Sequence, residues 1–121
     1  MVDKELLKGS TPMLILSVLV DGPSYGYEIA KRIEDRSEGV LEGKEGTLYP
    51  LLHQLETKGW LDSFKKDVDG RTRKYYRLTS RGKKALARKL GEWDMFSKAV
   101  DKTVSTVKNL RLKPSPGGSN R

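Results

Sequence analysis

The sequence contains no cysteine and a single histidine, His53. Without cysteine the chain can form neither a disulfide scaffold nor a thiolate metal site, and a reducing cytoplasm is the simplest compartment to expect. A metal site at His53 would have to be completed by carboxylates alone, because there is no second histidine. We therefore expect no bound metal or cofactor, and we interpret His53 as a surface residue.

Long hydrophobic runs are also missing. The longest apolar stretch, Met13 to Val20, is interrupted by Ser17 and is far shorter than the roughly 20 residues that cross a bilayer. The segment before it is charged and has no signal-type cleavage site, so we do not expect secretion. At 121 residues, the chain fits one compact domain with an appended element.

Positive charge is what the chain has in excess. Lysine and arginine number 24 against 16 aspartates and glutamates, which gives a formal net charge of +8. Such a surface attracts polyanions, with nucleic acid as the first candidate and an anionic membrane as the second. Because only 36% of the residues are hydrophobic, the core is expected to be modest, and oligomerisation would help to stabilise it.

Start and stop signals predict two helices in the first third of the chain. Thr11-Pro12 and Gly22-Pro23 bound a buried helix over residues 11–21, because proline is tolerated in a first turn and Gly-Pro ends a helix. Ser24 is expected to cap a second helix, which ends near residues 37–39. The charged residues of this second helix are expected to face solvent.

A third helix is predicted from the apolar spacing of Leu48, Leu52 and Leu55, with Gly59 as its C-terminal stop. A start near Gly46 or Thr47 would place Pro50 in the first turn, where a missing backbone donor is tolerated, whereas an earlier start would make it an interior proline that kinks the helix. The sequence leaves this start open. The residues left exposed on this helix are then Thr47, Tyr49, Pro50, His53, Gln54 and Lys58.

A β-hairpin is predicted next. Residues 60–66 and 73–78 are rich in aromatic and aliphatic side chains, and residues 67–70 between them are turn-forming. The hairpin also carries a large share of the positive charge, in Lys65, Lys66, Arg71, Arg73, Lys74 and Arg77.

The final helix is expected to begin after a Thr79 cap and to carry its apolar residues at steps of three and four. Such steps approximate a heptad seam, and a helix of about thirty residues reaches roughly 45 Å, too far for a domain of this size to cover. The seam therefore needs a partner, most simply a second copy of the chain. Its residues are Leu86, Leu90, Trp93, Phe96, Val100, Val104, Val107 and Leu110.

This order of elements is that of a winged helix-turn-helix domain. We expect a mainly α fold with a small β-hairpin: a DNA-binding domain over residues 1–78, a dimerisation helix over 79–112, and a disordered tail over 113–121. In such a domain the third helix enters the major groove of DNA, and the basic hairpin contacts the flanking backbone or minor groove. The candidate DNA contacts are Lys44, Thr47, Tyr49, His53, Arg71, Arg73 and Lys74.

The sequence also resembles a known family, the PadR-like winged-helix transcription regulators, and in particular their short subfamily with a single C-terminal helix. The resemblance extends over residues 5 to about 110. It is carried by YGYEI at 25–29, EGTLYP at 45–50, Leu55-Glu56 and RKYYRLT at 73–79.

The resemblance implies a role for several residues. Thr47 and Tyr49 match the recognition helix, residues 71–74 match the wing, and the helix after Thr79 matches the dimer interface. In the short subfamily a tryptophan at the position of Trp93 stacks on a flat aromatic or drug-like effector at that interface. Trp93 and Phe96 are thus the effector-site candidates, although both also fit as ordinary seam residues.

Three other functions compete with DNA binding as interpretations of the sequence. Residues 22–26 match G-x-S-x-G, but a hydrolase of that type needs a larger sheet and a triad histidine, so we interpret Ser24 as a helix cap and Gly26 as a site of close packing. A protein adaptor could dock an acidic partner on the basic face. A membrane-surface helix would need a broad apolar face, whereas the seam is narrow.

We therefore expect a cytoplasmic homodimer that binds a double-stranded, pseudo-palindromic DNA operator, usually represses, and is not an enzyme. Release by a small aromatic effector is a further expectation, and no membrane partner is expected.

Overall fold

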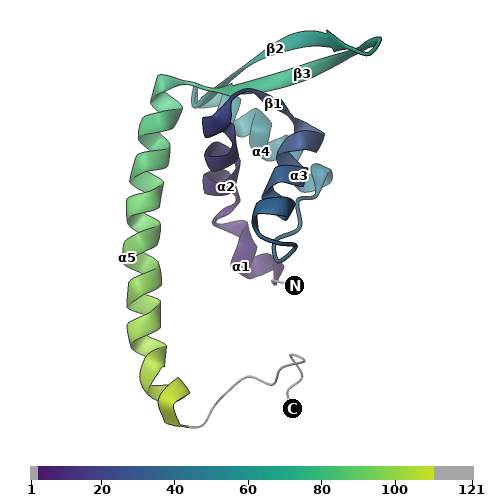
Figure 1. Ribbon diagram of the computed structural model, residues 1–121. Coiled ribbons are helices and arrows are strands. Elements are labelled where there is room, and N and C mark those ends of the chain that lie inside the picture. The colour runs from purple at the N-terminus through teal and green to yellow at the C-terminus, as the bar shows by residue number, and fades with distance from the viewer. Residues whose placement is uncertain (1–2, 111–121) are drawn as a thin grey trace. The chain divides into compact units, whose positions relative to one another are not determined.

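The computed structural model describes residues 3–110, and Figure 1 shows the order of their elements. The chain divides into two compact units, one reaching to Lys89 and the other beginning at Leu90. The predicted fold class, mainly α with a small hairpin, is confirmed. The elements are α1 (Lys4–Lys8), α2 (Thr11–Val18), the 3-10 helix η1 (Leu19–Asp21), β1 (Ser24–Tyr25), α3 (Gly26–Arg36), α4 (Glu45–Thr57), β2 (Leu61–Val68), β3 (Arg71–Leu78) and α5 (Ser80–Leu110).

The three strands form one antiparallel sheet in the order β1-β3-β2. The turn between β2 and β3 is only Asp69-Gly70, and both residues have positive φ, 52° and 76°. Such a turn matches the twist of a tight hairpin and favours glycine. The predicted turn over residues 67–70 is therefore too long, because Asp67 and Val68 still pair with β3.

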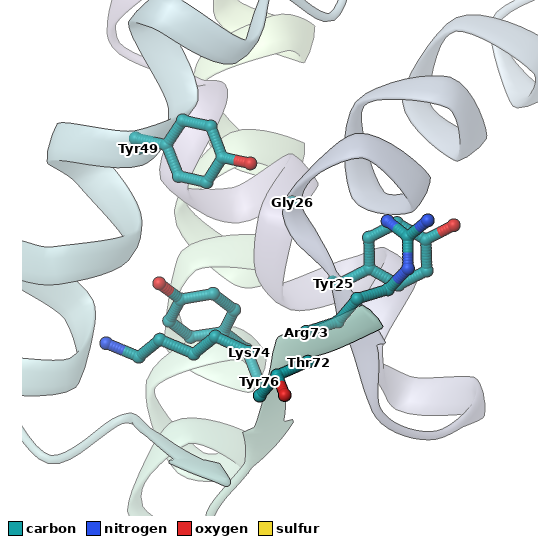
Figure 2. A pocket seen from close by; sticks show the side chains of 7 residues that line it. All are labelled: Tyr25, Gly26, Tyr49, Thr72, Arg73, Lys74 and Tyr76. Carbon is teal, nitrogen blue, oxygen red and sulfur yellow. The ribbon is translucent and has the colours of Figure 1, made fainter. Parts of the chain in front are cut away.

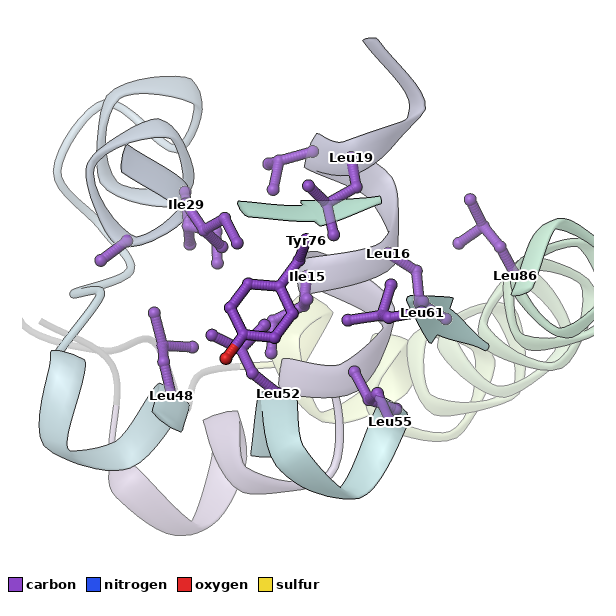
Figure 3. Close-up of a cluster of buried hydrophobic side chains, with 13 residues drawn as sticks. Ile15, Leu16, Leu19, Ile29, Leu48, Leu52, Leu55, Leu61, Tyr76 and Leu86 are labelled. Atoms are coloured by element: carbon purple, nitrogen blue, oxygen red, sulfur yellow. The ribbon is translucent and has the colours of Figure 1, made fainter. Parts of the chain in front are cut away.

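The core of the first unit lies between this sheet and the helices α2, α3 and α4, which gather on one side of it (Figure 1). The apolar spacing predicted on α4 is confirmed, because Leu48, Leu52 and Leu55 are at most 2% exposed. Figure 3 shows them in one cluster with Tyr76 of β3. The cluster also contains Ile15, Leu16, Val18, Leu19, Ile29, Ala30, Ile33, Leu61 and Leu86.

One predicted helix cap is wrong, and the structure defines the helix start that the sequence left open. Ser24 does not cap α3: it is fully buried in β1, where pairing with β3 holds it, and its hydroxyl donates to Glu28 Oε1 at 2.5 Å. Helix α4 begins at Glu45, so Pro50 lies in its second turn and not in its first. Proline has no N–H to donate to the carbonyl of Gly46, four residues earlier, which removes one bond from the helix.

Helix α5 contributes to both units. In its first turns Ala85 and Leu86 are 1% and 7% exposed and belong to the first unit, Leu86 within the core cluster. Leu86 therefore packs within its own chain, and its prediction as a seam residue is wrong. Beyond Lys89 the apolar side chains are accessible: Leu90, Trp93, Phe96, Val100 and Val107 are 41 to 60% exposed, and Val104 is half-buried.

Within residues 3–110, no helix combines the length and the apolar character that a membrane crossing requires. In the same range, no three histidine, cysteine or acidic residues gather closely enough to hold a metal ion. The tail predicted over residues 113–121 lies outside the described part of the chain.

Candidate nucleic-acid interface

The buried leucines of α4 leave its other side to solvent. At about 100° per residue, His53 lies within the accessible arc, with Thr47 and Tyr49 toward its two edges; all three are exposed. Lys44 precedes the first turn and forms an ion pair with Glu42 at 3.4 Å. The three contacts predicted on α4, and Lys44 just before it, are therefore all accessible, which reading base edges in a major groove requires.

An open hollow of about 390 Å³ lies beside Tyr49. Figure 2 shows that side chains from α4, β1 and β3 surround it, together with Gly26 at the start of α3. Cationic and hydroxyl groups of this kind hold the oxygens of backbone phosphates in protein–DNA contacts. The lining residues are Tyr25, Gly26, Tyr49, Thr72, Arg73, Lys74 and Tyr76.

The Tyr49 ring packs directly against Gly26. A Cβ added at residue 26 would lie 2.6 Å from Tyr49 Cε1, so the prediction that Gly26 allows close packing is confirmed. Partial burial raises the pKa of the Tyr49 hydroxyl above its ordinary 10.0, and the Glu45 carboxylate acts in the same direction. The hydroxyl is therefore protonated at neutral pH and can donate a hydrogen bond to an anion.

Arg73 is held on the sheet by aromatic contacts. Its guanidinium carbon lies 4.4 Å from the centroid of the Tyr25 ring, a cation–π arrangement that favours one orientation of a long side chain. Tyr25 meets Tyr75 edge-on at 5.4 Å, and Tyr75 stacks on Phe64 at 5.5 Å. Tyr25 was not predicted as part of the interface, because the two-residue strand that carries it is too short to show a strand pattern.

Lys74 has a different environment from Arg73. Its Nζ lies 3.3 Å from Glu56 Oε1 on α4, while Glu56 Oε2 accepts a hydrogen bond from the Ser63 hydroxyl of β2 at 2.5 Å. The Ser63 hydrogen bond and then Lys74 lower the pKa of the Glu56 carboxyl, and the bond to Glu56 raises the pKa of Lys74. Lys74 thus has a partner within the chain, whereas Arg71 and Arg73 form no ion pair with any residue between 3 and 110.

Trp93 and Phe96, the effector-site candidates, lie in the second unit. Their ring centroids are 6.0 Å apart, and the two side chains are 46% and 60% exposed in the single chain. Together they form an accessible aromatic surface on α5, next to the seam residues Leu90 and Val100.

Comparison with known proteins gives consistent findings. The sequence profile of the transcriptional regulator PadR-like family matches residues 15–88. A transcriptional regulator from Clostridium thermocellum, of known structure, is 36% identical with a TM-score of 0.78, covering 83% of this chain and 98% of that one. A PadR family regulator from Eggerthella lenta is 35% identical with a TM-score of 0.75, covering 84% and 88%. A transcriptional regulator of Mycobacterium tuberculosis is 35% identical over 83 residues, 69% of this chain and 75% of that protein.

Proposed function

The chain belongs to the transcriptional regulator PadR-like family, and from this premise we propose that it represses transcription as a homodimer bound to a DNA operator. The observation that carries the DNA-binding part of this proposal is the hollow beside α4. It brings Tyr49 of that helix and Arg73 of the hairpin together around an open space of about 390 Å³, and a hydroxyl and a guanidinium are groups that bind backbone phosphates.

In the proposed complex α4 lies in the major groove. Thr47 and His53 contact base edges or phosphates, and Tyr49 donates its hydroxyl to the backbone. Arg71 and Arg73 contact the phosphates flanking the groove. Lys44 and Lys74 lie on the same face, where each forms an ion pair with a carboxylate of its own chain. Base contacts give sequence preference, whereas phosphate contacts give affinity for any sequence.

This division of roles predicts different effects of Thr47→Val and Arg73→Ala. Thr47→Val removes a hydroxyl but keeps the methyl group, and we expect it to select a different consensus from a random DNA pool. Arg73→Ala is expected to select the wild-type consensus but to bind every sequence more weakly. The slope of the logarithm of affinity against the logarithm of salt concentration, here called the salt slope, should become shallower by about one for each phosphate that the arginine no longer neutralises. Thr103→Val, the same change on α5, is the control and should match the wild type. If the Thr47 and Arg73 variants select one and the same site, the assignment fails.

The homodimer is supported by the accessible seam of α5. Six apolar side chains follow one another at steps of three and four from Leu90 to Val107. Five of them are 41 to 60% exposed and Val104 is half-buried, and a second copy would remove them from water. A twofold pair of α4 helices would then read half-sites about one helical turn apart, roughly 34 Å, or a multiple of that distance.

An aromatic effector bound between the two copies is the third part of the proposal, supported by the adjacent exposed rings of Trp93 and Phe96. Quinoline or acridine derivatives are expected to quench Trp93 fluorescence and to weaken operator binding through the linked dimer geometry. Trp93→Phe should abolish the quenching, and so should Val100→Asp, which is expected to sediment as a monomer. Trp60→Phe is the matched control, and its fluorescence should still be quenched by the ligand. Quenching that survives Trp93→Phe would assign the ligand to Trp60 instead.

A further inference from the structure

Glu56 is the acidic residue that joins the predicted recognition helix to the wing. One of its carboxylate oxygens holds Lys74 of β3 at 3.3 Å, and the other accepts the Ser63 hydroxyl of β2 at 2.5 Å. The carboxylate thus connects α4 to both strands of the hairpin. Nothing in the recognition of base edges requires a negative charge at this position, and DNA phosphates would be repelled by it.

The ion pair between Glu56 and Lys74 determines which cations of the wing are available to DNA. Arg73 is oriented by the Tyr25 ring, which is uncharged, so its full positive charge remains. Lys74 lies on the same strand but is paired with a carboxylate. The Lys74 side chain is nevertheless 45% exposed against 29% for Glu56, so a phosphate can approach the ammonium group from the solvent side.

From this geometry we propose that Glu56 is an internal competitor of DNA phosphate: it occupies Lys74 and thereby lowers the affinity of the protein for DNA of any sequence. The proposal rests on the proposed function and adds a specific role for one side chain. While Lys74 is paired with Glu56, it helps to hold the wing in position and makes no contact with phosphate. Ser63 orients the carboxylate toward Lys74.

The competition has a clear consequence for sequence-independent binding. Affinity for random DNA comes almost entirely from cations that neutralise phosphates and release counterions. Each cation withheld from the backbone therefore weakens random binding directly, while hydrogen bonds from α4 to base edges are unaffected. A repressor that binds random DNA less tightly is free to exchange more rapidly between sites on a genome.

The test is the binding of the full chain to a random-sequence duplex, measured for the wild type and for Glu56→Gln across a range of salt concentrations. Glutamine keeps the size of the side chain and an oxygen that can accept from Ser63, but it releases Lys74. We expect affinity to rise on the order of tenfold at 0.1 M salt for each protomer on the duplex, and the salt slope to steepen by about one per protomer. Lys74→Gln alone should leave the slope close to that of the wild type, and the increase in affinity from Glu56→Gln should be smaller in the Lys74→Gln background.

Glu34→Gln, on the exposed side of α3, is the matched control for the loss of one negative charge. Equal affinities for Glu56→Gln and Glu34→Gln would overturn the proposal, and so would weaker binding by Glu56→Gln, which would make Glu56 a positioning residue only. Thermal unfolding of each variant identifies a loss of fold. A wild type that does not bind the duplex at all would instead overturn the proposed function, so the two failures are distinguishable.

Discussion

Gly82→Ala is expected to destabilise the winged-helix unit by about 3 kcal/mol, because the added methyl group has no space. Gly82 is buried in the first turn of α5. A Cβ there would overlap the carbonyl oxygen of Trp60 and lie 2.8 Å from Leu78 Cδ1. The obstacle is backbone and not the end of a flexible side chain, so rotation about a side-chain bond cannot relieve it.

The Trp60 backbone is itself held in place. Its carbonyl accepts from the Thr79 N–H at 3.1 Å, and its N–H donates to the Leu55 carbonyl at 3.0 Å. The Thr79 hydroxyl donates to Gly59 and accepts from the Gly82 N–H at 3.0 Å, which confirms Thr79 as the cap of α5. Moving residue 82 away from Trp60 would therefore break the junction between the sheet and α5.

Thermal unfolding followed by circular dichroism measures the effect, and a fall in melting temperature of at least about 10 °C is expected. Gly91→Ala is the matched control on the same helix, because no atom of the described chain outside the helix's own backbone lies within 4 Å of a Cβ built there. That variant should be more stable by about 0.5 to 1 kcal/mol, from the better helix propensity of alanine. A Gly82→Ala protein as stable as the wild type would contradict the packing described for this junction.

Local apolar spacing and start and stop signals were sufficient to predict α2, α3, α4 and α5 and which side of α4 is buried, whereas the short helix α1 was not predicted. Leu48, Leu52 and Leu55 repeat with the helical period, and burial on a helix depends on that period alone. The same reasoning failed at Leu86. The three-and-four spacing continues along α5 from Leu86 to Val107, yet Leu86 is covered by the core of its own chain. A repeat indicates that a face is covered but does not identify what covers it.

The candidate interface was assembled from individual residues of the sequence, but the contacts among them were not predicted. Arg73 meets Tyr25 only because β3 pairs with β1, which comes from a distant part of the sequence. The contact between Glu56 and Lys74 likewise requires α4 to pack beside the hairpin. Side chains that meet through such long-range pairing leave no spacing pattern along the chain, so Tyr25 and Glu56 could be found only from the three-dimensional structure.

The affinity of the protein for DNA is expected to fall steeply as the salt concentration rises. The chain carries eight more basic than acidic residues, and the hairpin beside α4 contributes Arg71 and Arg73, which pair with no acidic side chain among residues 3–110. Each cation that neutralises a phosphate releases a condensed counterion, so affinity falls as a power of the salt concentration. A dimer with about six to ten phosphate contacts would therefore depend on salt very steeply.

The most direct test of α4 and its basic hairpin as a DNA-binding face is the affinity of the protein for duplex DNA at 50 and 200 mM salt. We expect a loss of roughly 10³ to 10⁵ in affinity between the two concentrations. An affinity that changes by less than about tenfold would correspond to fewer than two phosphate contacts and would contradict a DNA-binding role for this face.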